Sequence, residues 1–337
     1  MKITLIGHSA CSISERLEEK LQGSLEGFDY SIVSVPDPQP GPRDMDPAVS
    51  ESKLQAASGW DVIVGGPIPK EIAEAAVNLK LFIGFGEESS GPGLKQLHRQ
   101  VRVFHTSRHS AGAAEFVVMS MLMLPRKVYF HDYNLRRGRW DSSERIWGEP
   151  PGVGTLDDKT VLIVCAGHTG SVIGKQLEGF GVHRIGVTAD LSQKPDGIDY
   201  LIDFDELHDY LPVADYIVAA SAHIPGTYPL FSTYEFDLMK PAAYFINVAE
   251  ARVADEMALY YALRDNSIAG AALDSWYRTP KTRDEICFPS DYPFHTLTNV
   301  IMSPSRAGWT KELVEKRVDE VANAIKHLYT KEPIANH

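Results

Sequence analysis

The residues with the clearest chemical meaning lie in the segment VLIVCAGHTGSVIG, where Cys165, Gly167 and Gly170 occupy the three small-residue places of G-x-G-x-x-G. A short apolar run precedes this turn and a helical pattern follows it. Gly167 would let the backbone approach a pyrophosphate, and the helix N-terminus would offer free N–H groups to the phosphates. The alternative is a structural turn in a sheet that binds no nucleotide. The motif predicts a dinucleotide site formed by Gly167, His168, Thr169 and Gly170.

An acidic side chain after the next strand would bind the adenosine ribose diol. Asp190 follows Gly170 by twenty residues and would favour NAD, because its charge repels the 2′-phosphate of NADP. Two alternatives stay open. In the first, Thr188 occupies the diol position and Asp190 is a solvated loop residue. In the second, Lys194 binds the 2′-phosphate of NADP. The predicted cofactor is NAD because of Asp190, and NADP is not excluded because of Lys194.

Five more segments accompany this turn in a definite order. They read LKLFIGFGEESSGPGL, HSAGAAEFVV, SAHIP, LMKPAAYFINVAEARVADEMALYYALRDNSIAGAALDSW and NVIMSPSRAGWT. Together with the glycine turn they resemble the D-2-hydroxyacid dehydrogenase family in order and spacing, over nearly the whole chain. The resemblance identifies the chain as a member of that family and implies a nicotinamide cofactor.

The resemblance also implies roles for individual positions. The first segment is similar to the loop whose backbone amides hold the substrate carboxylate, so Gly86 and Glu87 are expected to bind substrate. SAHIP is similar to the loop near the nicotinamide, and Asp274 matches the residue that holds the nicotinamide carboxamide. The expected cofactor-binding residues outside the glycine turn are Asp190, His223, Pro225, Val248, Ala249 and Asp274.

The three side chains that this family uses for catalysis are replaced at the matching positions. Glu250 stands in place of the substrate-binding arginine, Ser305 in place of the proton-transferring histidine, and Thr279 in place of the glutamate that holds that histidine. A carboxylate repels the acid that an arginine would bind, and a serine hydroxyl is a poor acid or base near neutral pH. The alternative is a shifted alignment that puts Arg252 or Arg306 in a catalytic place.

The substrate loop and the start of the long helix depart from the family as well. Glu88, beside Glu87, replaces a glycine, and His109 replaces an asparagine, with Arg108 next to it. His109 is therefore a candidate base, and Arg108 a candidate substrate-binding residue. The alternative is that these are solvated loop residues. The candidate set of new pocket groups is Glu87, Glu88, Arg108, His109, His223 and Glu250.

Short apolar strands alternate with helices along both halves of the chain, which predicts an α/β fold with two doubly wound, parallel-sheet, Rossmann-like domains. The family implies a formate/glycerate-dehydrogenase-like architecture. Residues 1–105 with 306–337 would form a flavodoxin-like substrate domain, and residues 106–305 the NAD(P)-binding domain. The expected strands are Lys2–Ile6, Tyr30–Val35, Asp61–Gly65, Lys80–Gly84, Val101–His105, VLIVCAG, HRIGVTAD, Tyr216–Ala220, Tyr244–Val248, Gly270–Leu273 and Val300–Met302.

The helix expected over Ala111–Leu124 is apolar on nearly every side. One domain covers only part of such a surface, and the following segment carries Trp140 and Trp147, side chains of a kind enriched at interfaces. We therefore expect a homodimer built through the coenzyme domains, as the family resemblance also implies. The segment from Asp132 mixes charges, tryptophans and prolines, and is expected to form an extended arm.

Composition narrows the range of partners. The chain has 337 residues and a formal net charge of −12, which argues against nucleic acid and anionic membranes as partners but not against a small anionic substrate. The three cysteines are far apart and show no metal-ligand spacing, so no metal site is expected and a reducing cytoplasm is favoured. The expected partner is a small-molecule ligand or substrate.

Two functions therefore fit the sequence. The first is an NAD(P)-dependent oxidoreductase with an altered active site that does not act on ordinary 2-keto or 2-hydroxy acids. The second is a catalytically inactive dinucleotide-binding protein that serves as a redox sensor or an assembly partner. The same observation motivates both, because the cofactor-side segments are kept while the catalytic side chains are replaced.

Overall fold

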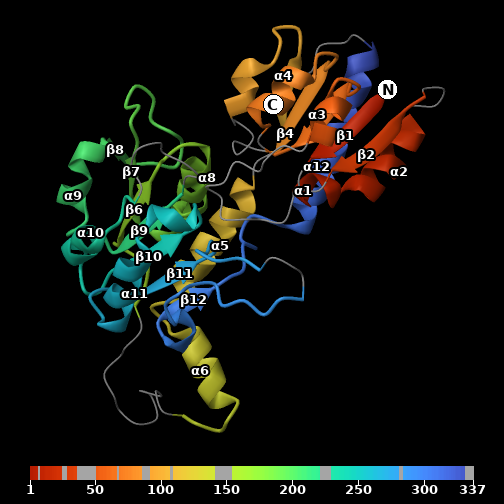
Figure 1. Cartoon of the computed structure of the whole chain (residues 1–337). Coiled ribbons are helices and arrows are strands. Elements are labelled where there is room, and N and C mark those ends of the chain that lie inside the picture. Colours follow the sequence, from red (N-terminus) through yellow and green to blue (C-terminus); the bar gives the residue numbers. More distant parts are fainter. Residues whose placement is uncertain are drawn as a thin grey trace. The chain divides into compact units, whose positions relative to one another are not determined.

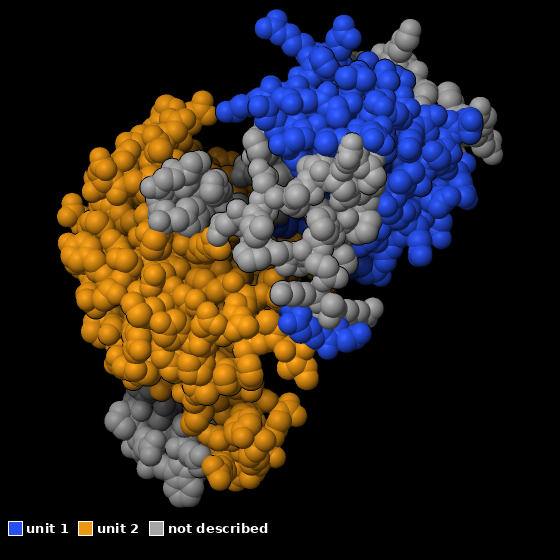
Figure 2. All heavy atoms as spheres, viewed as in Figure 1, with its two compact units in different colours: residues 1–109, 280–285, 310–337 blue, residues 110–279, 286–309 orange. Residues whose placement is uncertain are grey.

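The computed structural model describes residues 1–6, 8–24, 29–35, 51–66, 68–85, 92–106, 109–140, 154–220, 229–280 and 284–330. The chain divides into two compact units (Figure 2). The first comprises residues 1–109, 280–285 and 310–337, and the second residues 110–279 and 286–309. The first unit is thus made from both ends of the chain.

The first unit is built on a five-stranded parallel sheet in the order β2-β1-β3-β4-β5 (Figure 1). Its strands are β1 Lys2–Ile6, β2 Ser31–Val35, β3 Val62–Gly65, β4 Leu81–Phe85 and β5 Arg102–Thr106. Its helices are α1 His8–Cys11, α2 Ser14–Ser24, α3 Glu51–Ala57, α4 Lys70–Ala75, the 3-10 turn η2 Pro92–Gln96 and α12 Lys311–Thr330. The side chains of Leu17 and Leu21 on α2 are fully buried.

The second unit is built on a seven-stranded parallel sheet in the order β12-β11-β10-β9-β6-β7-β8 (Figure 1). Its strands are β6 Thr160–Val164, β7 His183–Val187, β8 Tyr200–Ile202, β9 Tyr216–Ala219, β10 Tyr244–Asn247, β11 Gly270–Leu273 and β12 Val300–Met302. Its helices are α5 Ser110–Met123, α6 Val128–Leu135, α8 His168–Gln176, α9 Leu207–Tyr210, α10 Thr233–Leu238 and α11 Glu256–Arg264. Short 3-10 turns lie at η3 Glu178–Phe180, η4 Phe204–Glu206, η5 Ala251–Val253 and η6 Phe294–Thr296.

The strand order of the second sheet reverses direction at β6, where β9 pairs with one side of β6 and β7 with the other. Such a switch point is where open parallel sheets bind ligands, at the carboxyl ends of their strands. The fold class expected from the sequence, α/β with two doubly wound parallel sheets, is confirmed.

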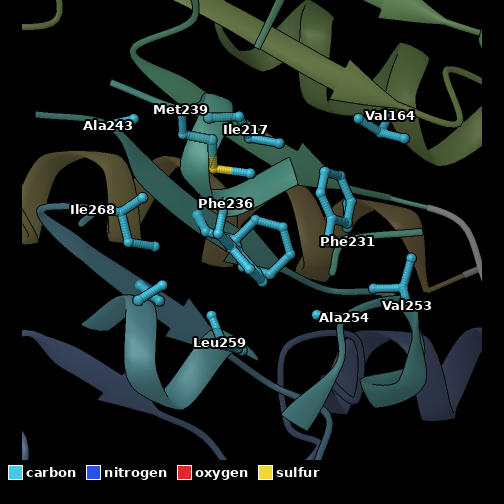
Figure 3. Packing of buried hydrophobic residues seen from close by; sticks show 14 of the residues in the cluster. Val164, Ile217, Phe231, Phe236, Met239, Ala243, Val253, Ala254, Leu259 and Ile268 are labelled. Carbon is cyan, nitrogen blue, oxygen red and sulfur yellow. The ribbon is translucent and has the colours of Figure 1, made fainter. Parts of the chain in front are cut away.

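A hydrophobic cluster that contains several aromatic rings packs on one face of this sheet (Figure 3). Phe231, Phe236 and Phe245 are at most 1 % exposed, and their ring centroids lie 5.0–6.2 Å apart. Offset and edge-on ring pairs of this kind are stabilising beyond the area they bury. The cluster attaches α10 to β10, so the segment before β10 is held against the sheet.

The segment that follows α5 differs from the expectation. An extended arm was predicted from Asp132, but α6 continues through Asp132 to Leu135. Two local contacts explain the helix: Asp132 forms an ion pair with Arg136 one turn later, and the guanidinium of Arg137 stacks 3.5 Å from the ring centroid of Tyr133. Pro125 separates α5 from α6, and residues 141–153 of the expected arm lie outside the described residues.

The apolar helix α5 is buried along one broad face and packs against α8. Ala111, Glu115 and Met119 lie four residues apart and form its exposed stripe. Within the described ranges, no helix combines the length and apolarity needed to cross a bilayer.

We predict that Gly174→Ala destabilises the protein. Gly174 lies on α8 against the backbone of Gly197, and a Cβ there would overlap the Gly197 carbonyl group. The cost should be about 1–3 kcal/mol, which exceeds the helix-propensity gain of up to about 1 kcal/mol. Thermal unfolding measures it, with Gly179→Ala as control because a Cβ on Gly179 meets no atom within 4 Å. An unchanged melting temperature for Gly174→Ala would contradict the close packing.

Candidate functional site

The carboxyl ends of four neighbouring strands form one continuous hydrogen-bonded edge in the second unit. Parallel pairing aligns these ends, so residues that follow different strands become neighbours. Backbone N–H groups join each strand end to the next: Val248 N to Ala219 O at 3.1 Å, Asp274 N to Asn247 O at 3.1 Å, and Ser303 N to Leu273 O at 2.9 Å. This edge carries several of the residues to which the sequence analysis assigns chemistry.

The glycine turn lies between β6 and α8, at the switch point. Cys165, at the place of the first glycine, has φ of 67°, a left-handed conformation that glycine adopts without strain. Gly170 packs closely, because a Cβ there would lie 3.1 Å from Ile163 Cγ2 and 3.3 Å from Cys165 O. Gly167 precedes α8, and a Cβ on it would meet no atom within 4 Å. The turn thus combines tight packing beneath the helix with open space before its first residue.

The first turn of α8 is attached to the start of α5. The hydroxyl groups of Thr169 and Ser110 lie 2.9 Å apart, and Ser110 is buried. His168, the first residue of α8, is exposed. The backbone N–H groups at the start of α8 are consequently held in a defined position, facing the space that Gly167 leaves open.

These features fit a dinucleotide. Free N–H groups at a helix N-terminus, with no Cβ atom in front of them, form a favourable phosphate site, and the start of α8 with Gly167 supplies this arrangement. The strained Cys165 keeps the same backbone path that a glycine would take. The pyrophosphate would therefore be held by Gly167, His168, Thr169 and Gly170.

The end of β7 carries the residues expected near the adenosine ribose. Thr188 is the first residue after the strand, and its hydroxyl accepts the N–H of Asp190 at 3.3 Å. The exposed carboxylate of Asp190 accepts the Ser192 N–H at 2.9 Å, and the hydrogen bonds from Ser192 lower the pKa of Asp190. Lys194 donates to Ile198 O at 2.6 Å. Asp190 is therefore ionised at neutral pH, and both Thr188 and Asp190 lie beyond the strand tip.

The loop after β10 holds Val248, Ala249 and Glu250. Asn247, which is 1 % exposed, orders it through two hydrogen bonds: its Oδ1 accepts the Ala249 N–H at 2.9 Å, and its Nδ2 donates to Glu250 O at 3.1 Å. Glu250 is half-buried and directly precedes the turn η5. A buried amide thus sets the backbone from which Glu250 projects.

The loop after β12 is held by Asp274. One carboxylate oxygen, Oδ1, accepts hydrogen bonds from the Ser303 hydroxyl, from Arg306 N at 2.8 Å and from Ala307 N at 3.0 Å. Ser305 is exposed, has φ of 56°, and donates its N–H to Asp274 O at 2.7 Å. No described residue bonds to the second oxygen, Oδ2. Asp274 is 7 % exposed, so Oδ2 is the atom available for a nicotinamide carboxamide.

The remaining expected site residues are placed differently or lie outside the description. Thr279 is exposed and lies in the segment that follows β11. His109 is half-buried and directly precedes α5. Gly86, Glu87, Arg108, His223 and Pro225 fall outside the described residues, as does Glu88. Among the described residues, the structure therefore brings Val248, Ala249, Glu250, Asp274 and Ser305 to one edge.

Several residues that order this edge were not singled out from the sequence. Asn247, Ser303 and Ser110 support the loops and the helix start, and Trp276 donates its indole N–H to Ser303 O at 2.8 Å. Tyr277 also orders this edge, because its hydroxyl donates to Ala254 O at 2.9 Å, and burial raises the pKa of that hydroxyl. The available signal was position, because polar residues directly after buried strands meet at one edge.

We predict separate effects for two glycines of the turn. Gly170→Val should abolish NADH binding and lower the melting temperature, because the side chain would collide with Ile163 and the Cys165 carbonyl group. Gly167→Ala should leave the melting temperature unchanged and weaken NADH binding about tenfold, since its Cβ enters only the open space before α8. Calorimetric titration and thermal unfolding of both variants measure this. Full NADH affinity in Gly170→Val would refute the assignment.

Known proteins resemble this chain over nearly its whole length. A glyoxylate reductase from Thermococcus litoralis is 29 % identical over 321 residues, which cover 92 % of this chain and 90 % of that one. An acyclic imino acid reductase solved in complex with NADPH and D-Arg superposes with a TM-score of 0.72 and 22 % identity, covering 99 % of both chains. An NAD-dependent formate dehydrogenase from Staphylococcus aureus, solved with NAD, superposes with a TM-score of 0.68 and 22 % identity. The match covers 100 % of this chain and 98 % of that one.

The two solved structures share the fold of this chain, and their low identity carries no argument beyond fold. The family comparison reaches further. The family model described as D-isomer specific 2-hydroxyacid dehydrogenase, NAD binding domain, matches residues 118–307, which include β6 to β12 and the glycine turn. The chain belongs to the D-isomer specific 2-hydroxyacid dehydrogenases, a family of NAD(P)-binding oxidoreductases.

Proposed function

We propose that this protein is an NAD(P)-dependent oxidoreductase whose active site has been altered so that ordinary 2-keto and 2-hydroxy acids are not its substrates. One observation carries the proposal. The glycine turn and Asp274 keep a geometry suited to the dinucleotide, while Glu250, Thr279 and Ser305 stand at the positions of the catalytic side chains.

The cofactor's part and the chain's part in such a reaction are distinct. A bound nicotinamide supplies a hydride or accepts one. The N-terminus of α8 would hold the pyrophosphate, and Asp274 Oδ2 would hold the carboxamide. Asp274 Oδ1 holds the loop of Ser305 through three donors, and Oδ2 of the same carboxylate would hold the nicotinamide carboxamide.

The replaced side chains alter recognition and proton transfer at once. An arginine binds a 2-keto acid through two parallel hydrogen bonds, whereas Glu250 repels the same carboxylate. Ser305 has no pKa near neutrality and so does not protonate a developing alkoxide efficiently. Thr279 carries no carboxylate, so it would not hold and charge-stabilise a histidine at position 305.

Relatives named for glyoxylate reduction make ordinary keto-acid reduction the competing expectation. The fold, however, also occurs in a protein named for imino acid reduction and in a formate dehydrogenase. The side chains at the reacting positions therefore decide between these substrates. In this chain, the charge of Glu250 opposes the keto-acid assignment.

A catalytically inactive dinucleotide-binding protein is the second candidate. The same replacements favour it, because they remove the known proton donor while the cofactor turn is kept. Turnover separates the two candidates, since both require NADH or NADPH to bind. NAD remains the proposed cofactor on account of the ionised Asp190, with NADP open because Thr188 lies nearer the strand tip.

We also propose that the protein is a homodimer. The exposed apolar side chains on and after α6 are Val128, Tyr129, Phe130, Tyr133, Leu135 and Trp140, and the exposed stripe of α5 adds Met119. So many exposed apolar side chains on one short segment favour a protein partner. The proposed partner is a second copy of this chain, and a reducing cytoplasm is its proposed location, since Cys11, Cys165 and Cys287 form no disulfide.

We predict negligible turnover of pyruvate, glyoxylate and hydroxypyruvate by the wild-type protein, measured as loss of NADH or NADPH absorbance. The combined variant Glu250→Arg, Thr279→Glu and Ser305→His should gain weak activity on these acids, because it restores a carboxylate-binding cation and a proton donor. The variant Glu250→Arg alone is the matched control, and it should remain inactive. Robust wild-type turnover would show that position 250 does not face the substrate.

We predict a mass near twice 37.3 kDa by light scattering at low micromolar concentration. Tyr129→Glu combined with Leu135→Glu should shift the protein to a single chain, because each places a charge in the proposed interface. Val213→Glu is the control, since Val213 is an exposed apolar residue outside α6. A wild-type mass of one chain would end the dimer proposal.

A further inference from the structure

We propose that the substrate of this site is a cationic C=N compound, a protonated imine or an iminium ion, and that Glu250 recognises its positive charge. The inference rests on the proposed function and names the substrate class for the same site. It follows from the charge at position 250, the absence of a titrating group at position 305, and the way both positions are held at the edge of the sheet.

Glu250 is placed by buried structure. Its loop is tied to Asn247 through two hydrogen bonds, and Val248 N donates to Ala219 O at 3.1 Å on the neighbouring strand. A position ordered this way keeps its place when its side chain changes. A carboxylate in the place of a guanidinium therefore inverts the preference of the site, which then repels an anion and attracts a cation.

The second carboxylate at this edge strengthens the same preference. Asp274 is 7 % exposed, and its charge is balanced by three hydrogen-bond donors that carry no formal charge: two backbone N–H groups and one hydroxyl group. Hydrogen bonds stabilise the ionised form but leave its negative charge in place. The basic residues nearby in sequence, Arg252 and Arg306, are both solvent-exposed. The two carboxylates of this edge, Glu250 and Asp274, are thus less exposed than these arginines.

The proton balance points to the same substrate. Reduction of a ketone leaves an alkoxide that must take a proton in the transition state, and Ser305 cannot supply one efficiently. An iminium ion already carries the positive charge that a proton would bring. Its carbon accepts a hydride from the reduced nicotinamide, the C=N π pair becomes the nitrogen lone pair, and the products are a neutral amine and the oxidised nicotinamide. The amine then takes a proton from water, so no protein acid is needed.

The binding test uses a stable cation in place of the reactive imine. Pyrrolidinium chloride is titrated calorimetrically into the wild-type protein saturated with NAD⁺ or NADP⁺, with acetate as the anionic comparison. We expect saturable binding of the cation, a loss of at least tenfold in affinity for Glu250→Gln, and no binding of acetate. Glu71→Gln, which removes an exposed carboxylate on α4, is the matched control and should bind the cation as the wild type does. Equal cation affinity in Glu250→Gln would overturn the role of Glu250.

The turnover test compares matched C=N and C=O compounds. Preformed 1-pyrroline and 1-piperideine are offered with NADH or NADPH, beside cyclopentanone, cyclohexanone and pyruvate. Turnover of the imines alone, reduced at least tenfold in kcat/KM by Glu250→Gln, supports the inference. Turnover of cyclopentanone or cyclohexanone without turnover of the imines overturns it and leaves the proposed oxidoreductase standing. Turnover of pyruvate overturns both the inference and the proposed function. Dinucleotide binding without turnover of any compound in a broad panel overturns both and favours the inactive binding protein.

Discussion

The close approach of α8 to its sheet is the constraint on which the second unit depends. At Gly170 the helix lies so near β6 that any Cβ would press on Ile163, and at Gly174 its backbone meets the backbone of Gly197. Without these contacts the helix would move outward and its N-terminal N–H groups would no longer converge on one point. The residue at the start of the turn, Cys165, tolerates a left-handed backbone to keep the same path.

The reacting positions and the groups that hold them in place are different residues. Asn247 orders the loop of Glu250, and Asp274 orders the loop of Ser305, each through hydrogen bonds to backbone atoms of the loop. Such bonds do not depend on the side chain that the loop presents. The proposed reacting positions can therefore carry other side chains while the backbone around them stays ordered.

Most of the fold could be predicted from the sequence because its strands are short, apolar and bounded by glycine, proline or polar residues. The strands Lys2–Ile6, Gly270–Leu273 and Val300–Met302 begin and end where the sequence placed them. The helix α6 could not be predicted from the sequence, because an ion pair and a cation–π contact stabilise a segment whose composition favours a loop. The two carboxylate oxygens of Asp274 differ, because Oδ1 accepts the bonds from the loop and Oδ2 does not. Only the structure shows this difference, since spacing along the chain does not distinguish the two oxygens.

The side chains at the proposed reacting positions bear on whether the site is rebuilt for another substrate or retired from catalysis. Two of the three proposed reacting positions, Thr279 and Ser305, carry neutral side chains, whereas position 250 carries a carboxylate on a loop that a buried amide orders. A carboxylate at this place repels an anionic ligand and attracts a cationic one. Glu250 therefore favours a rebuilt site over a retired one, and the cationic substrate is the feature that makes its charge useful.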